Sequence, residues 1–277
     1  MINEWLIAYG LLCVISLAIG SLLNVIIHRL PLMMQAEWTS QCHNLLHLPE
    51  KPSKTLNLFL PRSFCPACKK LIPAWHNIPI LSYCLLRGRC ANCHHHISLR
   101  YPFVEALCAG LSLLAAYFFG FNPTLLFALL FIWLVICLCF IDLQYQILPD
   151  SLSLSLVWLG LIANTQSLFT SLPNAVLSAV GAYMSLWILI KLYYLVTGKI
   201  GMGHGDFKLF AAFGAWFGWT QLPLILLMSS LFGAVIGIIY LKTTKQARET
   251  PIPFGPFLCI AGLISLFYGR AIITWYL

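Results

Sequence analysis

Charged side chains are scarce in this chain, and acidic ones are the scarcest. Only 9% of the 277 residues are charged and only eight are aspartate or glutamate, whereas 60% are hydrophobic and the mean hydropathy is +0.87. A water-soluble domain of this length does not need so much apolar surface. The composition therefore excludes a soluble globular protein and predicts an all-α, polytopic membrane protein.

The N-terminus lacks the basic segment of a cleavable signal peptide, and its apolar run is too long for one. The net charge of +8 could indicate nucleic-acid binding. However, nine of the sixteen lysines and arginines lie between Arg29 and Arg100, in the one long polar segment. Basic residues concentrated in a loop between spans indicate that the loop stays in the cytoplasm. We therefore expect a lipid bilayer around this protein and no nucleic-acid partner.

Hydrophobic runs recur along the whole chain, and a bilayer span needs about 20 apolar residues. The runs lie near residues 5–27, 102–119, 124–142, 151–168, 174–196, 207–219, 222–241 and 257–275. The run at 207–219 is short, so the sequence leaves open whether it crosses fully or is re-entrant. Without it, the basic cluster at 242–248 would face away from the cytoplasm, against the usual charge distribution. We therefore expect about eight transmembrane helices, a cytoplasmic 29–100 loop, and both termini on the opposite side.

Two of the few acidic residues stand beside these runs. Asp142 closes the third run, and Asp206 follows a glycine-rich stretch at the start of the sixth. A carboxylate near a span is costly and is usually functional. Since two whole spans separate the aspartates, both fall at the same membrane face. In a close carboxylate pair one group keeps its proton, so the charged one can activate water while the protonated one polarises a peptide carbonyl. The pattern predicts an aspartyl protease with Asp142 and Asp206 as catalytic residues.

Structural explanations exist for these segments too. Asp150 follows a proline and precedes a serine-rich helix, so we expect it to be the N-cap of the fourth span. Asp206 could likewise cap the sixth span, with Gly203 and Gly205 forming only a turn. The alternative is that these glycines form an active-site loop, where they permit a close approach of backbone and substrate. His204 could also influence the ionisation of Asp206.

The polar loop contains two Cys-x-x-Cys pairs, separated by 21 residues. Four thiolates at such spacing can close a tetrahedral structural zinc site, and a loop too small to build a core gains from such a metal. A disulfide pair or free thiols are the alternatives, and a cytoplasmic location disfavours disulfides. A redox role is disfavoured because no βαβ pattern surrounds the pairs. We expect His94–His96 to be solvated loop. The predicted zinc ligands are Cys65, Cys68, Cys90 and Cys93.

Several strings of the chain, in this order, resemble those of the type 4 prepilin peptidase family. Asp142 matches the first catalytic aspartate of that family in an Asp-x6-Pro-Asp string, and Asp206 matches the second in Gly-x-Gly-Asp-x-Lys-Leu. His204 departs from the family pattern, which often has glycine there. The other matching strings are Gly20–Pro31, Cys65–Glu105 with its cysteine pairs, and Pro253–Pro256.

The resemblance implies a bifunctional enzyme of the bacterial inner membrane. Such an enzyme cuts the basic leader from type IV prepilins and pseudopilins at the cytoplasmic face, and then methylates the new N-terminal amine with S-adenosylmethionine. Its setting would be type IV pili or type II secretion, with both termini periplasmic. The implied organisation is a first transmembrane helix at 1–28, a cytoplasmic zinc-binding domain with four cysteine ligands at 29–100, and a multi-span peptidase domain at 101–277.

The residues themselves say little about methyl transfer. The sequence has no nucleotide-binding glycine motif after a strand, so cofactor-binding residues stay unidentified. Two other classes also fit an aspartate-bearing membrane protein. A transporter or channel places carboxylates in its spans, but it should show repeat symmetry and needs no cysteine loop. A non-catalytic assembly scaffold would keep the cysteines but tolerate asparagine at both aspartates.

Overall fold

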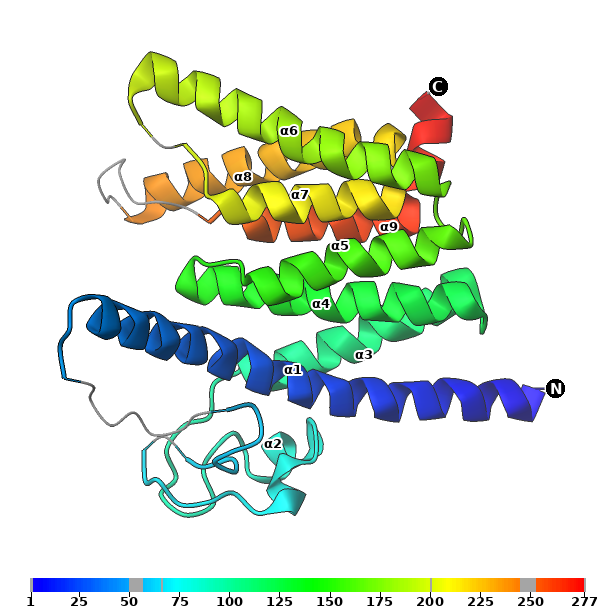
Figure 1. The fold of residues 1–277 in the computed structure, drawn as a ribbon. Helices are drawn as coiled ribbons and strands as arrows, with labels where there is room; N and C mark the ends of the chain where they lie inside the picture. Colours follow the sequence, from blue (N-terminus) through cyan, green and yellow to red (C-terminus); the bar gives the residue numbers. More distant parts are fainter. Residues whose placement is uncertain (1, 50–56, 66, 200, 245–252, 277) are drawn as a thin grey trace. The chain divides into compact units, whose positions relative to one another are not determined.

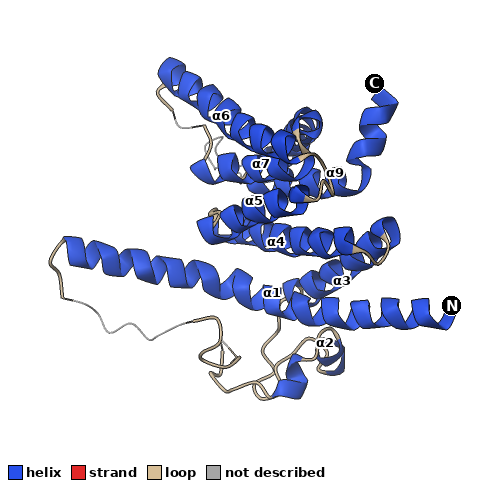
Figure 2. Cartoon of the chain, turned by 45° about the vertical axis from the view of Figure 1, so that its right-hand side comes forward, coloured by secondary structure: helices blue, strands red, loops and turns tan. Residues whose placement is uncertain are grey.

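The structure, a computed structural model, describes residues 2–49, 57–65, 67–199, 201–244 and 253–276. These parts contain helices, loops and two isolated β-bridges, with no β-strand among them, which confirms the all-α prediction (Figure 2). Short 3₁₀ turns lie at Ala74–Asn77 and Trp219–Gln221. The α-helices (Figure 1) are α1 (Ile2–Leu45), α2 (Leu81–Leu85), α3 (Arg100–Phe119), α4 (Pro123–Tyr145), α5 (Asp150–Thr165), α6 (Leu172–Thr197), α7 (His204–Phe217), α8 (Leu222–Thr244) and α9 (Gly255–Tyr276).

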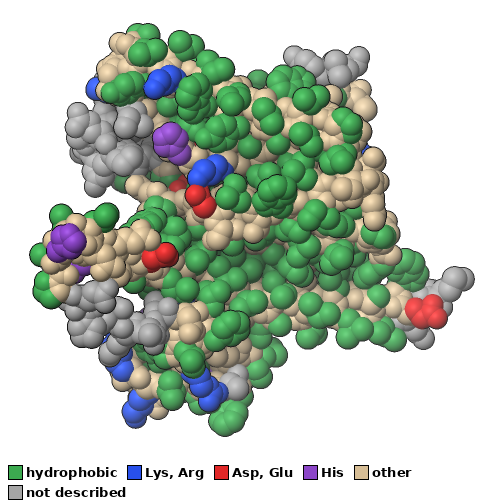
Figure 3. All heavy atoms as spheres, in the orientation of Figure 1, with side chains coloured by type: hydrophobic (Ala, Val, Ile, Leu, Met, Phe, Trp, Pro, Cys, Tyr) green, Lys and Arg blue, Asp and Glu red, His purple; other side chains and the backbone are tan. Residues whose placement is uncertain are grey.

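Each predicted hydrophobic run falls on one of these helices. Within the described residues, six helices are long and apolar enough to cross a membrane: α1, α3, α4, α6, α8 with the turn before it, and α9. Helices α5 and α7 have only 16 and 14 residues, less than a usual span. Hydrophobic side chains cover most of the face of the molecule seen in Figure 3. The chain is therefore a multi-pass helical membrane protein.

The short helix α7 is surrounded by protein. All its residues from Asp206 to Phe217 are buried except Lys208. It packs mainly against α5, α6 and α9. A helix that is buried on all sides needs no lipid-facing surface, so it can be shorter than a helix that meets the bilayer. This packing explains why the run at 207–219 looked short for a span.

Helix α1 is longer than the sequence indicated. The first span was expected to end near residue 27, but the helix continues through Pro31 to Leu45. At about 1.5 Å per residue such a helix is far longer than the roughly 30 Å apolar core of a bilayer. Hydropathy reports where a helix leaves the membrane, not where its backbone stops being helical. The polar continuation, residues 35–45, is mostly exposed.

The chain divides into two compact units, residues 1–117 and 118–277. The first holds α1, the polar loop and most of α3. Helices α1 and α3 approach so closely that a Cβ added to Gly20 would lie 2.8 Å from the Cα of Glu105. The Glu105 carboxylate also accepts a hydrogen bond of 2.8 Å from the backbone N–H of Ile80 in the loop. Arg29 of α1 ties down another part of the loop by donating to the carbonyls of Asn57, Leu58 and Pro61.

The second unit is built around α7. Trp216 donates from its indole N–H to the carbonyl of Leu156 at 2.8 Å, and Gly160 leaves the space that its ring fills. Asn164 of α5 donates to the carbonyl of Ala215 at 2.7 Å, so it satisfies a C-terminal group of α7. At Gly214, an added Cβ would lie 2.6 Å from a backbone oxygen of α6. These contacts fix the C-terminal end of α7, opposite the end that carries Asp206.

Candidate active site

Asp142 lies in the last turn of α4 and is buried, with 5% of its surface exposed. The chain reverses immediately after this turn, because Gln146 adopts a left-handed conformation with φ 54° and donates its N–H to the carbonyl of Asp142 at 3.0 Å. The carboxylate accepts a hydrogen bond from the backbone N–H of Gly255, at the start of α9. Its position is therefore set by two helices far apart in the sequence.

Asp206 is the third residue of α7 and is buried, with 8% exposed. Its carboxylate accepts a hydrogen bond from the N–H of Gly203, which is the N-cap residue of the helix. A side chain at this position that bonds back to the N-cap N–H is half of a capping box. The capping alternative is therefore partly realised. The second oxygen, Oδ1, is buried and has no hydrogen-bond partner among the described residues, and helix capping gives no reason for that.

The two carboxylates lie close enough to repel each other electrostatically. Leu148, in the turn after α4, lies between the backbone segments next to them. A Cβ added to Gly205 would be 2.7 Å from Leu148 Cβ, and one added to Gly255 would be 3.3 Å from Leu148 Cδ1. The fold thus gathers the end of α4 and the starts of α7 and α9 at one place. A close carboxylate pair of this kind can share one proton.

The glycines around the aspartates have different surroundings. A Cβ at Gly255 would lie 2.5 Å from Asp142 Oδ2, whereas one at Gly203 would lie 3.7 Å from Asp206 Oδ2, an ordinary contact. At Gly205 a larger side chain would collide with Leu148, so the protein itself requires glycine there, whether or not a substrate also approaches. The sequence offered no signal for the contacts of Leu148 or for the hydrogen bond from Gly255.

Alanine substitutions at these glycines should separate crowding from loop flexibility. We expect Gly255→Ala to lower kcat for peptide cleavage by about 100-fold, because a shift of about 1 Å at a reacting group has that effect. Gly205→Ala should cost about tenfold, since the nearby leucine can give way in part. Gly203→Ala should stay within about threefold of wild type. Steady-state kinetics on the three purified variants would check the order, and equal losses at all three positions would contradict it.

Asp150 does not cap α5, contrary to the prediction from the sequence. The N-cap residue is Pro149, which makes no side-chain capping bond, and Asp150 is the first residue of the helix. Its Oδ1 lies 2.6 Å from Nζ of Lys208 on α7. The carboxylate therefore forms an ion pair between two helix starts. The capping prediction failed because the sequence does not show that α7 brings a lysine to this point.

His204 is exposed at the start of α7, and its ring lies edge-on to that of Phe207 at 5.4 Å between centroids. Its suggested influence on Asp206 stays a prediction. His94, His95 and His96 are exposed in the polar loop, as expected.

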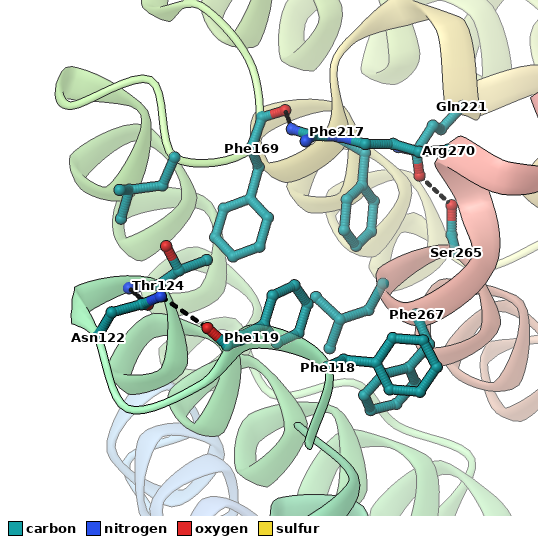
Figure 4. Close-up of a pocket in the computed structure, with 12 residues that line it drawn as sticks. Phe118, Phe119, Asn122, Thr124, Phe169, Phe217, Gln221, Ser265, Phe267 and Arg270 are labelled. Carbon is teal, nitrogen blue, oxygen red and sulfur yellow. Dashed lines mark hydrogen bonds between the residues drawn. The ribbon is translucent and has the colours of Figure 1, made fainter. Parts of the chain in front are cut away.

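A cavity of about 310 Å³ lies at the other end of α7 (Figure 4). Aromatic rings, including Phe119, Phe169 and Phe217, form much of its wall. Two buried polar residues, Gln221 and Ser265, are hydrogen-bonded to each other there. The aspartates are not among the residues lining this cavity, so it is separate from the candidate active site.

The four predicted zinc ligands converge within the first unit. The sulfur atoms of Cys65, Cys68, Cys90 and Cys93 all lie within 4.8 Å of one another, and those of Cys65 and Cys93 are 3.7 Å apart. A tetrahedral zinc site with metal–sulfur bonds of about 2.3 Å has sulfur–sulfur edges of about 3.8 Å. The arrangement therefore fits one zinc ion. None of these four cysteines forms a disulfide, which does not support the disulfide alternative.

The two cysteine pairs have the same local fold. In each, the residue after the second cysteine has a positive φ, 59° at Lys69 and 55° at His94, and donates its N–H to the carbonyl of the first cysteine. Backbone N–H groups point at the sulfurs: those of Cys93 and then Asn92 lower the pKa of Cys90 to about 6. The N–H of His95 acts in the same direction on Cys93, but burial and the neighbouring thiols outweigh it and raise the pKa of Cys93 to about 11. The lowered pKa of Cys90 favours its thiolate, which is the form that binds metal.

The structure is that of a multi-pass membrane protein with two buried aspartates near each other and a cluster of four cysteines. Comparison with protein families agrees: residues 14–119 match the bacterial peptidase A24 N-terminal domain, and residues 129–238 match the type IV leader peptidase family. The chain belongs to the type IV leader peptidase family.

Similar proteins named prepilin leader peptidase/N-methyltransferase occur in several bacteria. The chain is 59% identical to the one from Legionella pneumophila, over 100% of this chain and 99% of that protein. It is 51% identical to the one from Stutzerimonas stutzeri, over 95% and 92% of the two chains. It is 45% identical to the one from Neisseria gonorrhoeae, over 98% and 95%. No solved structure matches the chain.

Proposed function

We propose that this protein removes the basic leader of type IV prepilins and pseudopilins with Asp142 and Asp206 as its catalytic pair, and then methylates the new N-terminus. The observation that carries the peptidase proposal is the meeting of two buried carboxylates from α4 and α7, one of them with an unpartnered oxygen. A purely structural role would leave no reason for two such groups to be buried near each other.

The chemistry needs one proton shared by the pair. The ionised carboxylate takes a proton from water, and the water oxygen attacks the carbonyl carbon of the scissile peptide bond. The protonated carboxyl gives its proton to the carbonyl oxygen, which forms a neutral tetrahedral intermediate. When the C–N bond breaks, the first carboxyl protonates the leaving amine and the second takes back the proton of the hydroxyl. Water supplies every atom added, and the pair returns to its starting state.

The proposed topology puts this site at the cytoplasmic face of the bacterial inner membrane. The end of α4 and the start of α7 lie on the same side, because α5 and α6 run out and back between them. The basic loop at 29–100 would be cytoplasmic and both termini periplasmic. A prepilin whose apolar helix enters the bilayer, while its basic leader stays in the cytoplasm, would present the scissile bond at this depth.

For methylation, S-adenosylmethionine would supply the methyl group to the N-terminal amine freed by cleavage. We assign no residue to its binding. The four-cysteine cluster would hold one structural zinc ion, which would stabilise the fold of the 29–100 segment without taking part in peptide cleavage. These roles correspond to the organisation expected from the sequence: a first span, a zinc-binding segment and a peptidase membrane region from 101 to 277.

Incubation of the purified protein with a prepilin in detergent tests the proposal. Mass spectrometry should show loss of the leader, followed by the addition of one methyl group only when S-adenosylmethionine is supplied. A transporter or an assembly scaffold would leave the prepilin intact. Cleavage without methylation would remove only the second activity from the proposal.

A further inference from the structure

A short turn lies against the segments that position the two aspartates. Residues 146–149 join the end of α4 to the start of α5, and Leu148 in this turn lies against two glycines. One of them, Gly205, immediately precedes Asp206. The other, Gly255, donates the hydrogen bond to Asp142. Leu148 therefore fills the space between the two backbone segments that position the carboxylates.

An ion pair links the same two regions of the chain as the contact between Leu148 and Gly205. Asp150, two residues after Leu148, forms the 2.6 Å ion pair with Lys208, two residues after Asp206. The leucine contact and the ion pair thus join the turn and the first residue of α5 to the same end of α7. The lysine and aspartate side chains are 28% and 60% exposed. Ion pairs with such exposure contribute little to folding stability, so stability alone does not account for a pair as short as 2.6 Å beside the site.

We propose that Leu148 and the Asp150–Lys208 ion pair form a positioning element that sets the separation of the two catalytic carboxylates. This inference rests on the proposed peptidase function. None of the three residues takes part in proton transfer. They act through the placement of Asp142 and Asp206, and errors of about 1 Å in such placement slow reactions strongly. Breaking the element should therefore slow the chemical step and leave substrate binding intact.

A double-mutant cycle on the ion pair tests the proposal. We expect Asp150→Asn and Lys208→Gln each to lower kcat about tenfold, with KM within about twofold of wild type and an unchanged melting temperature. The double variant should be no slower than either single one, since the second substitution removes the partner of a contact already lost. Lys208→Arg, which keeps the pair, should retain kcat within about threefold.

The matched control is Lys199→Gln, which removes the same charge from an exposed lysine before the glycine loop and should leave kcat unchanged. Leu148→Ala should lower kcat, while Leu148→Met, which preserves volume, should not. If Leu148→Ala does not fold, the variants of Asp150 and Lys208 still test the proposal, because these side chains are partly exposed and their replacement should not unfold the protein. Wild-type kcat in Lys208→Gln, or losses that multiply in the double variant, would overturn the inference. Absence of cleavage by wild-type protein would instead refute the proposed function.

Discussion

Replacement of either aspartate by asparagine is expected to lower the rate of prepilin cleavage by at least about 1,000-fold. General acid–base catalysis by one group contributes about 10²–10⁴-fold, and asparagine can neither take nor give the proton. Asn is close to Asp in shape, so Asp142→Asn can still accept the N–H of Gly255, and Asp206→Asn that of Gly203. The amount of protein in the membrane should therefore not change. Cleavage assays with quantified membrane fractions measure both effects.

A carboxylate elsewhere provides the matched control. Glu37 is exposed in the polar continuation of α1, and Glu37→Gln removes one negative charge without touching the second unit. Its cleavage rate should equal that of wild type. Wild-type rates in Asp142→Asn or Asp206→Asn would show that the carboxylate is structural, and the catalytic groups of the peptidase would then lie elsewhere in the chain.

Serine at any one of the four clustered cysteines is expected to abolish stoichiometric zinc binding. Purified wild-type protein should carry about one zinc ion per chain. The four substitutions should act alike, because loss of any ligand opens the same tetrahedron of sulfurs within 4.8 Å. The loop between Arg62 and Arg100 should become susceptible to protease, since metal binding and folding of so small a segment are coupled. Elemental analysis and limited proteolysis measure the two effects.

Cys84 is the control for this series. It is an exposed cysteine of α2, between the two pairs in sequence and outside the cluster. Cys84→Ser should keep the metal and the protease resistance of the loop. Metal-free wild-type protein, or loss of zinc in Cys84→Ser, would rule out the assignment. Peptide cleavage should survive in part in the four-cysteine series, because the aspartates belong to the second unit.

The helix positions could be predicted because the hydropathy of this chain alternates strongly between apolar runs and short polar connections. The end of α1 could not, because residues after Pro31 lose apolar character while keeping helix-forming side chains. The burial of α7 was also hidden. The sequence analysis counted its short run as a span because of the side on which the basic cluster at 242–248 would otherwise lie. The structure explains the short length instead: protein neighbours surround α7, so it needs no lipid-facing surface.

The meeting of Asp142 and Asp206 followed from counting spans, since two crossings return the chain to the same face. What surrounds them could not be read in this way. The contacts of Leu148 with Gly205 and Gly255, and the pairing of Asp150 with Lys208, join segments that are more than 50 residues apart in sequence. Such contacts depend on how the helices pack, so local patterns predicted a cap at Asp150 where the fold forms an ion pair.

The central claim is that Asp142 and Asp206 act as one catalytic pair, and the double variant tests it most directly. Cleavage rates should be measured by mass spectrometry for Asp142→Asn, Asp206→Asn and the two combined, over incubations long enough to detect residual product. Groups that act as a unit show strongly non-additive losses. The account predicts that the double variant is no slower than the slower single variant. Losses that multiply, or a single variant that cleaves at the wild-type rate, would contradict it.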